Sequence, residues 1–300
     1  MIIKVWWKLS FELEKELEDL IIWKLHELKI FSFAFNSKIA EKEKFLLEIW
    51  LPKENWNKEK RILLEVKLSD FLKEKYLSHV SFYWDLIKEE DWTEGWKKYW
   101  GPSQIGNNLV ILPCWMELPK EFCNKMVIKI DPGAAFGTGS HPSTSLCLEQ
   151  IERNLFDKKK ILDIGSGSGI LTIASKLFGA KSLYALDSDY LACNSTAENF
   201  KLNFGNLNDL KIYEGKFLEL LKEYAFRDFD YILCNILAEV ILKIIPYMNS
   251  VISKEGKLIL SGIITSQKDE IIKLLNFNNF EVVDVSSKND WICIVARQIP

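Results

Sequence analysis

Alternating glycines directly after a short apolar segment are the most informative feature of the sequence. Gly165, Gly167 and Gly169 lie in ILDIGSGSG, residues 161–169, where an apolar strand is expected to lead into a helix. Glycine permits a tight turn there and lets a ligand approach the backbone without meeting a Cβ atom. A dinucleotide-binding loop would have its third glycine at position 170, but that residue is Ile170. The spacing therefore argues against the pyrophosphate of a dinucleotide.

Two acidic residues accompany these glycines. Asp163 lies two residues before Gly165, and Asp187 ends the next predicted strand. A carboxylate at the end of the second strand is well placed to bind the two hydroxyls of a ribose. The structural alternative for Asp187 is the N-cap of the helix that follows. Taken with the glycines, the carboxylates predict a nucleoside site.

The D-x-G-x-G-x-G pattern and the acidic residue ending the second strand resemble the Rossmann-like methyltransferases that use S-adenosyl-L-methionine. Asn235, in CNILAE (234–239), ends a later predicted strand, where a parallel sheet delivers side chains to the ligand crevice. Methyltransferases of nitrogen atoms often have N/D-P-P-Y/F here, but both prolines and the aromatic residue are absent. This departure argues against the DNA-adenine and glutamine-amide groups. A helix cap is the structural alternative for Asn235.

A second helix start precedes the glycine segment. Pro142 suits the first helical turn after a cap at Ser140 or His141. We expect the backbone N–H groups and the hydroxyls of Ser143 and Thr144 to be exposed at this N-terminus, which favours an anion. The methionine carboxylate of the cofactor is such an anion. A phosphate-binding P-loop is the rival, but no G-K-[S/T] follows.

The loop before this helix, DPGAAFGTGS (131–140), contains three glycines. We expect these glycines to make the loop flexible, so that it can open for cofactor exchange and then place Phe136 over the site. His141 is a tempting base, but a His-Pro pair at a helix start is more often a structural cap.

Regular alternation of strands and helices surrounds these residues from position 159 onward. Strands joined by helices through short loops predict a doubly wound, mostly parallel sheet. Its ligand crevice lies at the carboxyl ends of the strands. Two final β segments, FEVVDVS (280–286) and DWICIVAR (290–297), are close enough to form an antiparallel hairpin.

The first part of the chain has the order β-α-β-β-α-β, which is typical of a small ferredoxin-like α+β domain. We expect strands at 3–9, 31–35, 45–51 and 79–87, and helices at 11–28 and 58–75. The predicted domains are therefore a ferredoxin-like domain at 1–87, a linker helix and connecting strands at 88–130, and a methyltransferase domain at 131–300.

The composition limits the other functions. With 300 residues, 48% of them hydrophobic, the chain can bury the cores of two modest domains. A net charge of -3 argues against wholesale wrapping of nucleic acid. Six cysteines without a C-x-x-C pair and only three histidines predict no metal site. The sequence contains neither a signal-peptide h-region nor a membrane span, so we expect a cytoplasmic protein.

The motifs DPGAAFGTGSHPSTSLCLE, ILDIGSGSGIL, ALDSD, CNILAE and LSGIITSQ together resemble the bacterial methyltransferase family of the eleventh large-subunit ribosomal protein. The resemblance is close over residues 90–300, and over 1–87 only the order of elements matches. It implies cofactor contacts at Thr144, Gly165, Asp187 and Asn235, with Gly167 in the same loop.

The resemblance also implies lysine side chains and N-terminal amines as methyl acceptors, and a small amino-terminal domain that recognises the ribosomal protein. Asn235 would orient cofactor and amine, and Phe136 would cover the site. We expect no direct DNA binding and no membrane partner, and leave contact with rRNA open. An RNA or small-molecule N-methyltransferase with the same cofactor site is the alternative.

Overall fold

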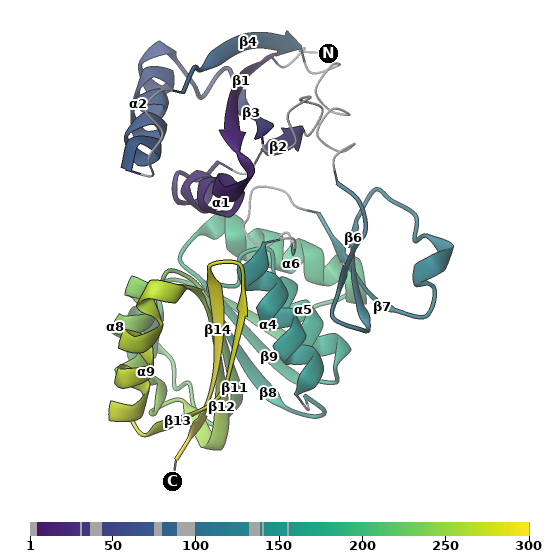
Figure 1. Ribbon diagram of the computed structural model, residues 1–300. Helices are drawn as coiled ribbons and strands as arrows, with labels where there is room; N and C mark the ends of the chain where they lie inside the picture. Colours follow the sequence, from purple (N-terminus) through teal and green to yellow (C-terminus); the bar gives the residue numbers. More distant parts are fainter. Residues whose placement is uncertain are drawn as a thin grey trace. The chain divides into compact units, whose positions relative to one another are not determined.

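The computed structural model describes residues 5–30, 32–36, 44–74, 80–88, 100–131, 139, 141–154 and 156–299. The chain divides into two compact units, Met1–Gly101 (unit 1) and Pro102–Pro300 (unit 2) (Figure 1). The boundary falls inside the predicted connecting segment, 88–130. The linker helix expected there lies outside the described residues, apart from Trp100.

Unit 1 is a four-stranded antiparallel sheet with the order β2-β3-β1-β4. Its elements are β1 (Val5–Glu14), α1 (Glu18–Glu27), β2 (Phe33–Asn36), β3 (Lys44–Pro52), α2 (Lys58–Glu74) and β4 (Tyr83–Lys88). One helix follows β1 and the other follows β3, so the chain has the order β-α-β-β-α-β.

The first helix begins later than the sequence predicts. Residues 11–14, expected in that helix, continue β1. Phe11 and Leu13 are buried, and they pair with Leu47 and Phe45 of β3. The helix was predicted from the helical spacing of the leucines. In residues 11–14, however, buried side chains alternate with exposed glutamates, and this alternation is the period of a strand.

Unit 2 contains a seven-stranded sheet with the order β10-β9-β8-β11-β12-β14-β13. The strands are β8 (Lys160–Ile164), β9 (Ser182–Asp187), β10 (Leu210–Glu214), β11 (Phe229–Asn235), β12 (Ile252–Ile264), β13 (Phe280–Lys288) and β14 (Trp291–Gln298). All pairs from β10 to β12 are parallel, whereas β14 is antiparallel to both β12 and β13. The mostly parallel sheet and its antiparallel C-terminal hairpin are confirmed.

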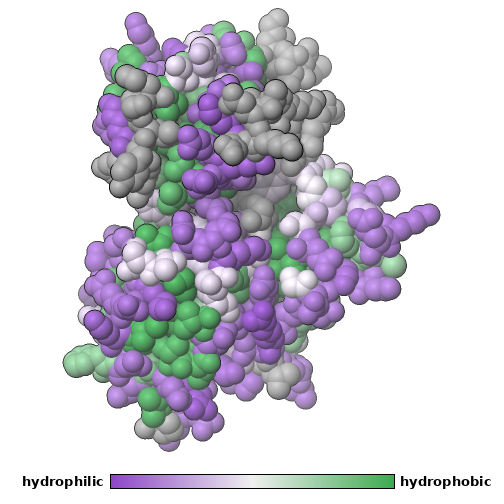
Figure 2. All heavy atoms as spheres, viewed as in Figure 1, coloured by the Kyte–Doolittle hydropathy of each residue, from purple (hydrophilic) through white to green (hydrophobic). Residues whose placement is uncertain are grey.

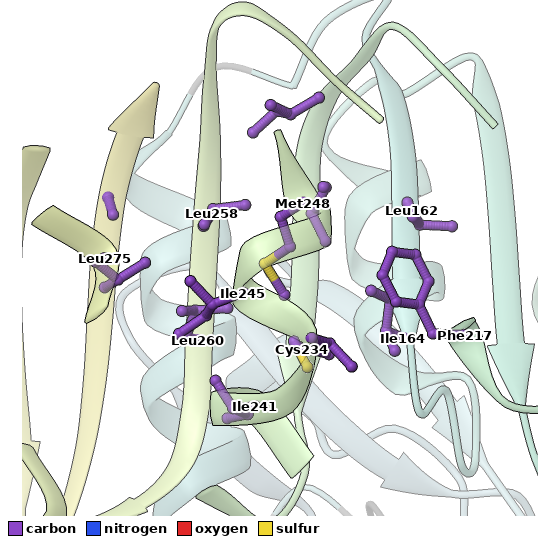
Figure 3. Close-up of a cluster of buried hydrophobic side chains, with 14 of the residues drawn as sticks. Leu162, Ile164, Phe217, Cys234, Ile241, Ile245, Met248, Leu258, Leu260 and Leu275 are labelled. Atoms are coloured by element: carbon purple, nitrogen blue, oxygen red, sulfur yellow. The ribbon is translucent and has the colours of Figure 1, made fainter. Parts of the chain in front are cut away.

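Helices cover both faces of this sheet (Figure 1). They are α4 (Pro142–Arg153), α5 (Ile170–Leu177), α6 (Tyr190–Phe204), α7 (Phe217–Glu223), α8 (Ala238–Met248) and α9 (Lys268–Phe277). Figure 3 shows side chains of α8 and the strands packed together in one buried layer, including Leu162, Ile164 and Cys234. Because Ile164 and Cys234 are anchored in this core, the residues that follow them are fixed at the strand ends.

A second, smaller sheet belongs to unit 2. Its strands are β5 (Ser103–Ile105), β6 (Leu109–Pro113) and β7 (Met126–Ile130), in the order β5-β6-β7. The turn between β5 and β6 is held by Glu152 of α4, whose carboxylate accepts the N–H groups of Asn107 and Asn108. This contact attaches the small sheet to the helix that begins at the site.

Figure 2 shows a face with mainly hydrophilic side chains and smaller hydrophobic areas between them. Among the described residues, no helix combines the length and the apolar composition needed to cross a membrane.

Candidate functional site

The carboxyl ends of three neighbouring strands bring the predicted residues to one edge of the large sheet. Gly165 follows β8, Asp187 ends β9 and Asn235 ends β11, and β8 lies between the other two strands. The first turn of α4 reaches the same edge, because the Asn235 Nδ2 donates to Thr144 Oγ1 at 3.1 Å. Residues predicted from three separate motifs thus share one site.

Asp187 holds the glycine segment and the start of the next loop. Its Oδ2 accepts the N–H of Gly167 and its Oδ1 accepts the N–H of Asp189, each at 3.0 Å. Burial raises the pKa of the carboxyl, and the backbone N–H groups of Asp189 and Gly167 oppose this shift. The helix-cap alternative for Asp187 is wrong, because Asp189 caps α6 by accepting the N–H of Leu191.

Asn235 is 8% exposed, and only one end of its amide is satisfied within the described structure. Its Nδ2 donates to Thr144, while its buried Oδ1 has no hydrogen-bond partner among the described residues. A buried acceptor without a donor costs about 1–3 kcal/mol, so a ligand that donates a hydrogen here would be favoured. Asn235 is not the cap of α8, because Leu237 occupies that position.

At the start of α4 the hydroxyls of Ser143 and Thr144 are not exposed as predicted. His141 is the N-cap, and its Nδ1 accepts the N–H of Ser143 at 3.3 Å and lies 2.8 Å from Ser143 Oγ. The imidazole packs edge-on against Trp291, with ring centroids 4.6 Å apart. Ser143 and Thr144 are both buried, so the prediction that their hydroxyls are exposed is wrong. His141 has the structural role, and Phe136 lies outside the described residues.

Gly165 is required by the close packing of two loops. Its φ is +76°, and a Cβ atom there would lie 2.3 Å from Cγ2 of Ile236. Ile236 directly follows Asn235, so this contact joins the β8–α5 loop to the β11–α8 loop. A side chain at position 165 would therefore have to push the Ile236 side chain aside and would hold the backbone in a strained left-handed conformation.

Thr172 and the environment of Asp163 were not anticipated from the sequence. Thr172 Oγ1 donates to Oδ2 of the fully buried Asp163 at 2.6 Å, and Asp163 Oδ1 has no partner among the described residues. Burial raises the pKa of Asp163 to about 7; the charge of Asp187 adds to the shift and the Thr172 hydrogen bond opposes it. The available signal was a threonine among apolar residues in the first turn of this helix.

We expect Asp163→Asn to remove a pH dependence of stability. In the folded protein the carboxyl ionises only near pH 7, whereas the unfolded carboxyl ionises near its model-peptide value of about 3.9. Between these pH values the folded state binds more protons, so the stability of the wild type falls as pH rises from 4 to 7. The melting temperature of Asp163→Asn, measured from pH 5 to 8, should decline less, and at pH 8 it should exceed that of the wild type. A steeper decline in the variant would contradict the assignment.

The polar groups of this site fit a nucleoside cofactor linked to an amino acid. A half-buried carboxylate ends the second strand, a glycine segment follows the first, and the Asn235 carbonyl oxygen has no donor among the described residues. In the described part of the chain, no three His, Cys, Asp or Glu side chains are grouped so that they could hold a metal ion. All six cysteines are free thiols.

Comparisons with known proteins match nearly the whole chain to a single family. The sequence model of the family "Ribosomal protein L11 methyltransferase (PrmA)" matches residues 5–299, which extends the resemblance seen over 90–300 into unit 1. A ribosomal protein L11 methyltransferase of Prochlorococcus marinus (strain MIT 9515) is 56% identical over 299 residues, covering 100% of both chains. One from Synechococcus sp. (strain RCC307) is 34% identical over 98% of this chain and 97% of its own length.

A solved structure gives the same result. The crystal structure of ribosomal protein L11 methylase from Lactobacillus delbrueckii subsp. bulgaricus is 32% identical, with a TM-score of 0.61, and it covers 67% of this chain and 100% of that chain. With this fold, this site and these matches, the chain belongs to the ribosomal protein L11 methyltransferase family, whose members are S-adenosylmethionine-dependent methyltransferases.

Proposed function

We propose that this protein transfers methyl groups to lysine side chains and the N-terminal amine of ribosomal protein L11, in the cytoplasm. The names of its relatives support the substrate. The observation that carries the proposal is Asn235, a buried amide at the end of β11 whose carbonyl oxygen lacks a donor among the described residues. An amine is a donor of the kind that this oxygen would bind.

The cofactor would be held by residues at the three strand ends. The Asp187 carboxylate suits the ribose hydroxyls, and the backbone at Gly165 and Gly167 suits close approach of the cofactor. Thr144 fixes the Asn235 amide by accepting its Nδ2–H at 3.1 Å, so the free oxygen has one orientation. When bound, the cofactor supplies a methyl group attached to a positively charged sulfur.

The chain's own residues have to position an uncharged amine for in-line attack on that methyl group. Asn235 Oδ1 would accept one amine hydrogen and so direct the nitrogen lone pair. A free lysine has a pKa of about 10.4, and burial beside a positive charge lowers it. Solvent can then take the proton, so the reaction requires no dedicated base.

Unit 1 is proposed as the part that recognises the ribosomal protein, with Phe136 of unit 2 covering the cofactor. Three apolar side chains of α2 support a recognition role, because Ile62, Leu63 and Val66 are each about half exposed. A group of exposed apolar side chains on one helix is a common feature of protein-binding surfaces.

Intact-mass spectrometry of L11 after incubation with the enzyme and S-adenosylmethionine tests the proposal. We expect mass gains in steps of about 14 Da, since each step replaces a hydrogen by a methyl group. Asn235→Ala should reduce the rate about 100-fold or more, because the amine loses its orienting acceptor. Peptide mapping should place the gains on lysine side chains and the N-terminus.

A parallel reaction with rRNA in place of L11 provides the comparison. Methylation of rRNA without a mass gain on L11 would contradict the proposed substrate while leaving the cofactor site intact. Asn203→Ala is a matched control variant, because this asparagine lies on α6 and binds the backbone of β7. A rate for Asn203→Ala as low as that of Asn235→Ala would show that the loss is not specific to the site.

A further inference from the structure

Two asparagine side chains of α6 bind the backbone at the end of β7 and just after it, as a neighbouring strand would. Asn203 Oδ1 accepts the N–H of Lys129 at 2.9 Å, and its Nδ2 donates to the carbonyl of the same residue at 2.7 Å. Asn199, one helical turn earlier, makes the corresponding bonds with Asp131, at 2.8 Å and 3.2 Å. Among the described strands β7 pairs only with β6, so the Asn203 amide occupies its other edge and the Asn199 amide binds the residue just past its end.

Asn199 also contacts the glycine segment. Its Nδ2 donates to the carbonyl of Ser168 at 3.0 Å, and the residue is 2% exposed. Thr196, one turn earlier on α6, donates through Oγ1 to the carbonyl of Gly167 at 3.0 Å. The carbonyl side of the segment is thus bound by α6, while the N–H of Gly167 donates to Asp187.

We propose that Asn199 is a positioning residue for cofactor binding, which sets the glycine segment relative to the end of β7. This inference rests on the proposed cofactor site at Gly165 and Gly167. An amide is the appropriate group, because it donates to two carbonyls and accepts an N–H at the same time. Removing it takes a donor from the carbonyls of Asp131 and Ser168, so the glycine segment loses its link through α6 to the end of β7, while its bonds with Thr196 and Asp187 remain.

The test compares Asn199→Ala with Asn203→Ala. Each substitution removes two hydrogen bonds to one residue's backbone, Lys129 in β7 for Asn203 and Asp131 just after β7 for Asn199, but only Asn199→Ala also removes a bond to the glycine segment. Calorimetric titration with S-adenosylhomocysteine should show affinity weakened about tenfold in Asn199→Ala and less than about twofold in Asn203→Ala. With L11 as substrate, the KM for S-adenosylmethionine should rise by a similar factor in Asn199→Ala, with kcat nearly unchanged.

Equal affinities in the two variants, or a loss of kcat at unchanged KM, would overturn the inference and leave Asn199 a structural residue. If Asn199→Ala does not fold, Asn199→Ser is measured in the same way, and it must bind S-adenosylhomocysteine more weakly than Asn203→Ala does. A wild-type protein that binds the cofactor without methylating L11 contradicts the proposed substrate only. A wild-type protein that does not bind S-adenosylhomocysteine removes the basis of this inference as well.

Discussion

Asp187→Ala is expected to weaken cofactor binding about 100-fold or more. The carboxylate accepts two backbone N–H groups in addition to any ribose hydroxyl, and hydrogen bonds to charged groups contribute about 1.5–3 kcal/mol each. The variant therefore loses the hydrogen bond that orients Gly167 and the carboxylate proposed to bind the ribose hydroxyls. Calorimetric titration with S-adenosylhomocysteine measures the effect, and a change below about fivefold would contradict the assignment.

Asp189→Ala is the matched control for this experiment. Asp189 is an acidic residue two positions later, and its side chain caps α6 by accepting the N–H of Leu191 at 3.0 Å. Loss of an N-cap costs about 1 kcal/mol of stability. We therefore expect a lower melting temperature for Asp189→Ala with cofactor affinity nearly unchanged, the reverse of the pattern for Asp187→Ala.

Gly262→Ala is expected to have a large effect on stability, of about 3 kcal/mol or more. The φ of Gly262 is +81°, and a Cβ atom there would lie 2.1 Å from the carbonyl oxygen of Ile236 and 2.8 Å from its carbonyl carbon. Both are backbone atoms, so no side-chain rotation relieves the overlap. Because Ile236 follows Asn235, the substitution should also displace the Asn235 amide and reduce methyl transfer. Urea unfolding and the L11 mass assay measure the two effects.

Gly205→Ala separates the overlap from the backbone conformation. Gly205 has a similar φ of +76° at the end of α6, but a Cβ atom there would meet nothing within 4 Å. A left-handed conformation by itself costs about 1–2 kcal/mol for a residue with a Cβ atom. If Gly262→Ala lowers the free energy of unfolding no more than Gly205→Ala does, the overlap with the Ile236 backbone does not contribute to the loss of stability.

Much of the site was predictable because its chemistry is local in the sequence. The alternating glycines of 165–169 indicate a tight turn between a strand and a helix. Asp187 and Asn235 could be selected because each is the last residue of a predicted strand. The mostly parallel sheet followed from the alternation of strands and helices, and the final hairpin from two β segments joined by a short connection, whereas the order of the strands came only from the structure. Each of these signals depends on neighbours within a few residues.

The helix predicted for residues 11–14 is wrong because their structure depends on distant contacts and not on neighbouring residues. Residues 11–14 contain leucine and glutamate, which suit a helix, but pairing with β3 makes them a strand. The strand is decided by burial of Phe11 and Leu13 against a segment more than thirty residues away in the chain. Local helix propensity is a weak preference that tertiary contacts of this kind override.

The family could be recognised, and a nucleoside site at particular strand ends predicted, from the sequence, because both depend on short-range spacing. How the residues of the site are held depends on contacts that only the folded chain makes. Asn235 is bound by Thr144, 91 residues earlier, and Asn199 by Asp131, 68 residues earlier. Hydrogen bonds between segments so far apart form only when packing of the whole unit brings the segments together. No local pattern specifies which polar side chain will meet which backbone group.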